Sequence, residues 1–143
     1  MGAPCPRSAT QRDTAPDFPL AGGGGPVYVT PWDTEGLYDL DQRYLNREGW
    51  FSQKLLFIVG PGYRGPILVR GHQLDGPGEL RFQESLGAPV GEEQRLTDPA
   101  GTSPTRGARH WGVYTLWRSE GCYALQFDGL DFSEIIVFQV VYR

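Results

Sequence analysis

The chain has 143 residues, enough for one domain and too few for a second full hydrophobic core. Its net charge is −4, its pI is about 5.1 and its only lysine is Lys54, so it lacks the clustered basic stripe of a protein that binds a phosphate backbone. No apolar run approaches the ~20 residues of a membrane-spanning helix. We therefore expect neither nucleic-acid binding nor a transmembrane segment.

Residues 1–25 predict a flexible tail, followed by a β-sandwich domain over residues 26–143. The tail holds four prolines before the run Gly22–Gly25, a composition that buries too little apolar surface to fold alone. It is typical of a tether or of a disordered terminus, and both interpretations stay open. The first six residues lack the charged start and the apolar segment of a signal peptide. The chain is then a mature domain, the product of a misassigned start, or a cytoplasmic protein.

Short apolar or alternating runs, separated by glycine and proline, predict strands along the rest of the chain. The dense turn residues of 60–66 join two of these runs as a hairpin. Residues 33–49 are expected to form a polar loop with at most one irregular strand, and residues 87–109 a long polar connection. The runs that predict strands are 27–30, 54–59, 67–71, 79–82, 111–118, 122–127 and 133–142.

These runs together predict an all-β fold. No segment keeps a helical period over three turns, and turn signals recur throughout. We expect an antiparallel β-sandwich of about seven or eight strands, Ig-like, behind an extended N-terminal tail.

Two cysteines, Cys5 and Cys122, are too far apart in sequence for the closely spaced ligand pairs of a zinc site. They form either one disulfide between the tail and the last hairpin or two free thiols. A disulfide closing so long a loop is worth on the order of 4–5 kcal/mol in the chain-entropy model.

The segments 65–77 and 119–125 and the closing strand resemble uncharacterised bacterial secreted proteins and lipoproteins. In that family a strand led by Gly-Pro ends in a Leu-Asp turn, and a later Gly-Cys-aromatic strand precedes a final apolar strand. Cys5-Pro6 and the glycine run are similar to the start of that family after its lipid-modified cysteine. Tyr123 stands where a tryptophan is common, and the export signal is missing. The resemblance implies an extracytoplasmic β-sandwich, secreted or anchored at the cell surface, and brings no catalytic residues.

Candidate catalytic and metal-binding groups are sparse. A copper site of the His₂Cys type would need a histidine soon after Cys122, and none follows. Cys122 and His110 would form a nucleophilic pair only if the fold joined them. The pairs Glu92-Glu93 and Asp39/Asp41 are suited to calcium, but are expected to form solvated surface. Asp75, Asp128 and Asp131 fit turn geometry, and His72 precedes a turn. We expect no catalytic residue, no metal and no cofactor.

Aromatic side chains give the one functional hint. Exposed rings on loops bury a large area at low entropy cost, and so would form a platform for a sugar or a protein. The alternative is that these rings plug the ends of the sandwich. The candidate ligand-binding residues are Trp32, Tyr38, Tyr44, Trp50 and Tyr63.

Two functions from different classes follow. The first is a non-enzymatic extracytoplasmic module, binding or structural, with a protein or polysaccharide ligand held by the loops 33–50 and 87–109 at one end. The second is a small hydrolase that uses carboxylates or a Cys/His pair. The shortage of catalytic groups favours the first.

Overall fold

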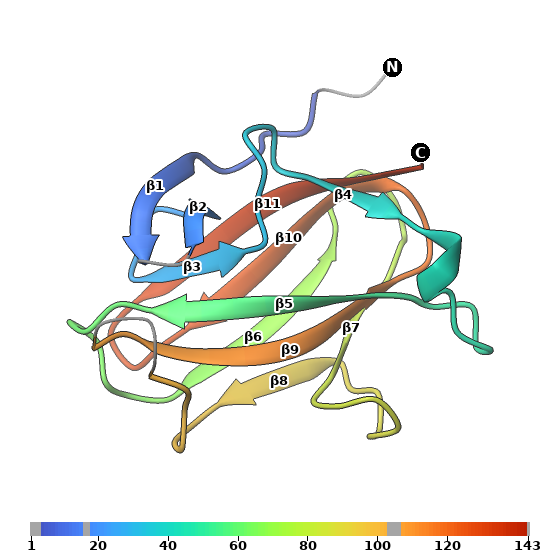
Figure 1. Cartoon of the computed structure of the whole chain (residues 1–143). Helices are drawn as coiled ribbons and strands as arrows, with labels where there is room; N and C mark the ends of the chain where they lie inside the picture. Colours follow the sequence, from blue (N-terminus) through green and yellow to red (C-terminus); the bar gives the residue numbers. More distant parts are fainter. Residues whose placement is uncertain (1–3, 16–17, 103–106, 143) are drawn as a thin grey trace.

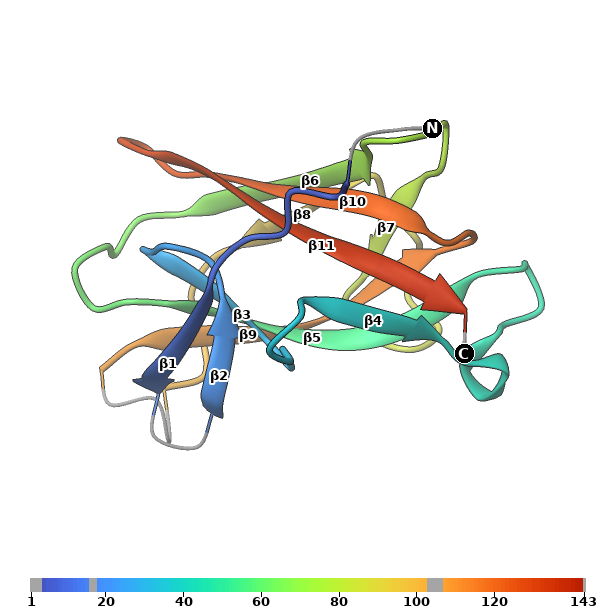
Figure 2. The same ribbon diagram turned by 90° about the horizontal axis from the view of Figure 1, so that it is seen from above.

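In a computed structural model the chain forms two β-sheets packed face to face (Figure 1; Figure 2). The structure describes residues 4–15, 18–102 and 107–142. These residues form eleven strands and one short 3-10 helix, η1 (Gln42–Tyr44). None of the helical structure in them is long enough to cross a bilayer. The prediction of an all-β sandwich is confirmed, although seven or eight strands was too low a number.

The first sheet, sheet A, has the order β1-β2-β3-β5-β9-β7, and sheet B has the order β4-β11-β10-β6-β8. Neighbouring strands are antiparallel except β4, which runs parallel to β11. The bounds in sheet A are β1 Thr10–Ala15, β2 Phe18–Gly22, β3 Val27–Thr30, β5 Phe51–Val59, β7 Leu80–Gln83 and β9 Arg109–Trp117. Those in sheet B are β4 Leu37–Leu40, β6 Ile67–Gln73, β8 Glu93–Leu96, β10 Gly121–Asp128 and β11 Ser133–Tyr142.

The strand order is that of an immunoglobulin-like sandwich. Strands β3-β5-β9-β7 repeat the A-B-E-D order of such domains, and β11-β10-β6 repeat G-F-C. Tyr123, early in β10, donates its hydroxyl proton to the carbonyl of Ser119 at 2.8 Å. This bond from the F strand back to the preceding turn is the tyrosine corner of that architecture. The Ig-like prediction is therefore confirmed by the pairing of this chain's own strands.

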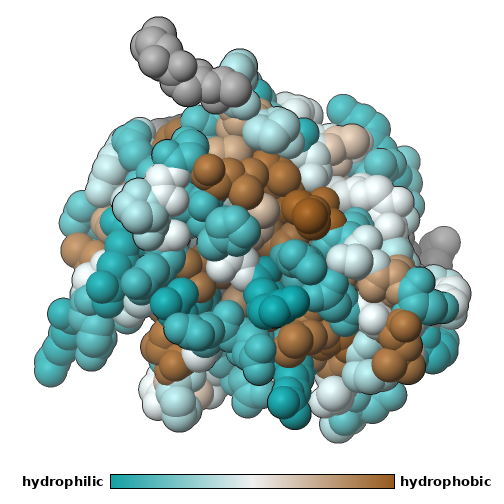
Figure 3. Space-filling model, turned by 180° about the vertical axis from the view of Figure 1, so that it is seen from behind, coloured by the Kyte–Doolittle hydropathy of each residue, from teal (hydrophilic) through white to brown (hydrophobic). Residues whose placement is uncertain are grey.

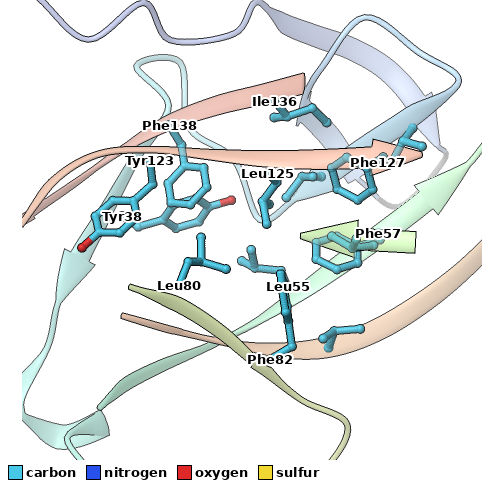
Figure 4. Close-up of a cluster of buried hydrophobic side chains, with 14 of the residues drawn as sticks. Tyr38, Leu55, Phe57, Leu80, Phe82, Tyr123, Leu125, Phe127, Ile136 and Phe138 are labelled. Carbon is cyan, nitrogen blue, oxygen red and sulfur yellow. The ribbon is translucent and has the colours of Figure 1, made fainter. Parts of the chain in front are cut away.

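The core lies between the sheets and is built from alternate residues of the long strands (Figure 4). Leu55 and Phe57 of β5 face Leu125 and Phe127 of β10, and all four are fully buried. The rings of Phe57 and Phe127 meet edge to face, 5.2 Å between centroids. Such pairs stabilise by about 0.5–1.5 kcal/mol beyond their buried area, and so add to the stability of the core.

Residues 4–15 and 18–25 are bound to the sandwich, whereas the sequence predicts a flexible tail over residues 1–25. Residues 4–9, which we call the strap, cross sheet B, and Cys5 forms a disulfide with Cys122 of β10. Ser8 donates its backbone N–H to the carbonyl of Val137 at 2.9 Å and accepts the Val137 N–H on its hydroxyl at 2.8 Å. Strands β1 and β2 then extend sheet A. Backbone pairing needs no apolar pattern, which explains how so polar a segment is ordered.

The glycine run is a tight turn rather than part of a tether. Gly23 and Gly25 have φ of 116° and 89°, conformations that favour glycine. Glu134 of β11 accepts the N–H of Val27 at 2.9 Å and the N–H of Gly24 at 3.2 Å. Burial raises the pKa of this carboxyl above its usual value, against the effect of those bonds. One side chain of β11 thus fixes the turn that leads into β3.

The outer face of sheet B is mostly polar, with apolar side chains gathered in its middle (Figure 3). Leu74 and Ile135 are exposed there, beside a shallow cavity lined also by Gly71 and Ala124. The close packing of β6 on β10 needs Gly71, because a Cβ there would lie 2.7 Å from the carbonyl oxygen of Ala124.

Candidate functional site

A cavity of about 320 Å³ opens where β3 is too short to accompany β5. β5 pairs with β9 along its whole length, but β3 pairs only with residues 56–59 of β5. The first half of β5 therefore lacks β3 beside it, and β4 of sheet B lies across the gap. We call this cavity the acidic corner. Its lining residues are Pro31, Trp32, Asp33, Leu37, Tyr38, Asp39, Asp41, Tyr44 and Gln53.

Three of the five predicted ligand-binding residues line this corner, namely Trp32, Tyr38 and Tyr44. Trp32 and Tyr38 are each only 6% exposed, whereas Tyr44 is 52% exposed. Their rings thus form no open platform. Trp32 and Tyr38 build the wall, and Tyr44 is the ring that remains available at the rim.

Trp32 is held from several sides. Its indole N–H donates to the hydroxyl of Thr10 in β1 at 3.0 Å. A Cβ at Gly22 or at Gly36 would come too close to the ring, so both glycines allow the indole to lie flat against the backbone. Its edge meets the Tyr38 ring at 6.2 Å between centroids. This packing fixes the back of the acidic corner.

Tyr38 donates its hydroxyl proton to the carbonyl of Pro31 at 2.5 Å. Burial raises the pKa of this phenol far above its usual value, and the nearby Asp33 carboxylate adds to the effect. The hydroxyl therefore stays protonated and satisfied, and serves the structure rather than acid–base chemistry.

Three carboxylates, Asp33, Asp39 and Asp41, give the corner its charge. Asp33 accepts the N–H groups of Glu35 and Leu37 on one oxygen, at 2.8 and 3.0 Å, and so shapes the turn before β4. Asp39 is exposed on β4. Among the residues that the structure describes, no lysine or arginine lines the cavity.

Asp41 binds a cation of the chain itself. Its carboxylate binds the Arg43 guanidinium through the Nε and Nη2 atoms, with a shortest distance of 2.6 Å. The same guanidinium lies 5.6 Å from the centre of the Tyr44 ring. The side-chain hydrogen bond from Arg43 is the main cause that lowers the pKa of Asp41. A carboxylate and a ring at the rim therefore hold a planar cation together.

Gln53 is a residue of the corner that the sequence did not bring to attention. It lies at an inward position of β5, between Phe51 and Leu55, directly across from Thr115 of β9. An amide at an inward position of a strand is the signal that would have found it. The prediction began this strand at residue 54, and so missed it.

The other two predicted aromatic residues lie elsewhere. Trp50 is buried under the guanidinium of Arg118, 3.9 Å from the ring centre. Tyr63 donates to the carbonyl of Pro66, accepts the N–H of Leu130 and packs edge to face on Phe132 at 4.8 Å. Both plug turns at the ends of the sandwich, the role considered as the alternative for these rings.

The Cys/His pair is ruled out, because the sulfur of Cys122 is bonded to Cys5 and carries no thiol. The loops 33–50 and 87–109 do not share one end either. Phe51 pairs with Trp117 and Val59 pairs with Arg109, so the segments that enter β5 and β9 reach opposite ends of sheet A. The antiparallel pairing of β5 and β9 is the reason.

No protein-family model matches the chain, and no curated protein matches its sequence. Among solved structures it is similar to the ASH / PapD-like domain of human CEP192 (PapD-like domain 7), with 14% identity and a TM-score of 0.36 over 80% of this chain and 82% of that one. A TM-score this low does not establish a common fold, so the Ig-like architecture rests on the strand order described above.

Proposed function

We propose that this protein is a non-enzymatic binding module that acts outside the cytoplasm and takes a basic side chain of a partner protein into the acidic corner. The observation that carries this proposal is the lining of the cavity. Among the described residues, three carboxylates, an amide and an exposed ring line it and no lysine or arginine does, while Arg43 pairs with Asp41 at the rim. A cavity of this size takes one lysine or arginine side chain, and its charge favours a cation over a neutral or anionic group.

The rim supports the choice of an organic cation. Arg43 lies on Asp41 and beside Tyr44, which is the pairing that an arginine or lysine of a partner would meet. Carboxylate and ring faces are complementary to a guanidinium, because it stacks and donates hydrogen bonds at once. Tyr44 is more than half exposed, so it is available for such a contact.

The Cys5–Cys122 disulfide supports the proposed location outside the cytoplasm. Such bonds form and persist in oxidising environments outside the cytoplasm. A secreted or surface-anchored protein, as the resemblance to secreted proteins and lipoproteins implies, would keep this bond throughout its working life.

The test is an NMR titration with N-acetyl-arginine amide and N-acetyl-lysine amide as probes. We expect saturable shifts of the Gln53 side-chain amide and of the Tyr44 backbone, with a dissociation constant on the order of 1 mM that rises with added salt. Asp39→Asn should weaken binding about fivefold, the value of roughly 1 kcal/mol for one charge contact. Asp131→Asn, an exposed carboxylate outside the corner, is the matched control and should leave binding unchanged.

Tyr44→Ala tests the ring separately from the charges, with Tyr114→Ala on the outer face of sheet A as its control. Only the Tyr44 variant should lose affinity, by a few fold. The proposal would be refuted if no shifts appear at a probe concentration 20-fold above about 1 mM. It would also be refuted if the shifts persist unchanged in both Asp39→Asn and Tyr44→Ala.

A further inference from the structure

A second cavity, of about 510 Å³, lies at the diagonally opposite corner of the sandwich. β7 pairs only with residues 114–117 of β9, so the first half of β9 lacks β7 beside it. β8, the other edge strand of sheet B, contributes residues across this gap. We call this cavity the indole corner. Its lining residues are Glu84, Gln94, Arg95, Thr97, Asp98, Pro99, Gly101, His110, Trp111, Gly112 and Val113.

Trp111 is the half-buried tryptophan that gives the corner an aromatic wall. Its indole N–H donates to the carbonyl of Thr97 at 2.9 Å, which fixes the ring in its plane. The guanidinium of Arg109 lies 5.1 Å from the ring centre. Arg109 is 4% exposed and donates to the carbonyls of Tyr63 and Gly65 at 3.2 and 2.9 Å. The indole is thus held by a cation that is itself anchored, and does not need to be ordered by a ligand.

His110 lies against the loop that closes the corner. Gly101 and His110 exchange backbone hydrogen bonds at 2.9 and 2.8 Å, and a Cβ at Gly101 would collide with the imidazole. Burial lowers the pKa of His110 below its usual value, which favours the neutral ring. A neutral imidazole both donates and accepts hydrogen bonds.

The polar groups of this corner balance in charge. Glu84 accepts from the side-chain amide of Gln94 at 3.2 Å, and Asp98 pairs with Arg109 at 3.4 Å. Arg95 is exposed on β8. Two carboxylates therefore stand beside two guanidinium groups, Arg95 in the lining and Arg109 behind it, whereas the acidic corner has three carboxylates beside one guanidinium, that of Arg43. The indole corner therefore favours neither a cationic nor an anionic ligand, and it offers several hydrogen-bond donors and acceptors around one ring.

We propose that the indole corner binds a neutral carbohydrate, namely a hexose unit of an oligosaccharide. A pyranose has a face of C–H groups and a rim of hydroxyls. The C–H face would lie on Trp111, and the hydroxyls would bond Gln94, Glu84 and Arg95. A rigid ring with a few convergent polar groups is the usual composition of a small-molecule site. This site is separate from the acidic corner, so it stands or falls independently of the proposed function.

The test is an NMR titration with cellobiose, maltose, lactose and N,N′-diacetylchitobiose as probes. The chain has four tryptophans, so four indole N–H signals report on it, and Trp111→Phe assigns the relevant one. We expect at least one disaccharide to shift the Trp111 signal saturably, with a dissociation constant on the order of 1 mM. The signals of the buried Trp32, Trp50 and Trp117 should stay in place.

Two test substitutions, each with its own control, separate an effect on binding from an effect on folding. Trp111→Ala should weaken binding about tenfold, whereas Trp50→Phe, which alters an indole stacked on Arg118 outside the cavity, should not change it. Arg95→Gln leaves the core untouched and should weaken binding a few fold, with the exposed Arg47→Gln as its control. No shift with any of the four disaccharides at 50 mM, or equal affinity in Arg95→Gln and Arg47→Gln, would overturn the proposal.

Discussion

At the acidic corner β3 ends before it reaches the first half of β5, and at the indole corner β7 ends before it reaches the first half of β9. The same mismatch of strand length thus opens a cavity at two diagonal corners of one sandwich. The acidic corner is walled by buried rings and charged by carboxylates, and the indole corner has a half-buried ring with balanced charges. Backbone pairing decides where a cavity opens, and side chains decide what it can hold.

The largest expected difference between the corners is in folding. Trp32→Ala should cost about 3–5 kcal/mol of unfolding free energy, because the ring is buried and its N–H bond is lost. Trp111→Ala should cost only about 1–2 kcal/mol, since the ring is half-buried. Urea unfolding of both variants measures the two values. Equal losses of unfolding free energy would mean that Trp111 contributes as much to folding as Trp32 does.

Beyond its effect on global stability, removal of the disulfide should loosen the acidic corner more than the indole corner. Replacing Cys5 and Cys122 by alanine should cost about 4–5 kcal/mol in the chain-entropy model, because the bond closes a long loop of the unfolded chain. The strap leads into Thr10, which holds the indole of Trp32. Hydrogen exchange of the Trp32 indole should therefore speed up more in the double variant than that of Trp111. Equal acceleration of both would show that the strap supports the whole sandwich.

Gly101→Ala should disturb the indole corner by steric crowding. The added methyl group meets the imidazole of His110, and such overpacking costs about 1–3 kcal/mol. Gly24→Ala is the control, since a Cβ there has open space around it. Gly101→Ala should alter the NMR signals of His110 and Trp111 and leave those of Tyr38 unchanged. A melting temperature equal to that of Gly24→Ala would contradict this packing.

The smallest effect is on the pH dependence of folding. Burial lowers the pKa of His110 below the usual value of about 6.5, so the unfolded chain binds this proton more tightly than the folded one. Its contribution to stability is present above about pH 6.5 and is lost as the pH falls through the folded-state pKa. His110→Gln should flatten that slope in urea unfolding between pH 5 and 7.5. Asp41, whose pKa is held low by Arg43, titrates at more acidic pH, and Glu134, whose pKa is raised by burial, is present in both the original chain and His110→Gln, so the difference between the two isolates His110.

The sequence predicts the central strands well, because β5, β9, β10 and β11 carry apolar or alternating runs that the core requires. It misses β1, β2 and β8, and it allows one irregular strand over 33–49, where β4 lies; the order of these strands comes from backbone pairing with a neighbour. β8 reads Glu-Gln-Arg-Leu, which has no apolar period at all. The predicted loop 87–109 therefore contains a strand.

Prediction of the site is limited for a related reason. The aromatic residues of the segment 33–49 led to the prediction of Tyr38 and Tyr44 as ligand-binding residues. The residue type alone, however, does not tell whether a ring is buried or exposed. Trp32 is buried because Gly22, from a segment expected to be a tail, packs against its ring. Both cavities depend on where β3 and β7 end relative to longer strands, a relation between segments that no local pattern contains.

The Cys5–Cys122 bond also determines how the domain transmits mechanical tension between its ends. A pull on the strap enters β10 at Cys122, and a pull on the other end enters β11 near Tyr142, with Gly121 paired to Val140 between them. Both points of load lie at one end of a single hairpin. The chain between the two cysteines, which are 117 positions apart in sequence, is bypassed, and with it the whole of sheet A. Stretching an oxidised molecule would therefore load the β10–β11 ladder first, together with β4 beside the end of β11, and leave the indole corner relaxed.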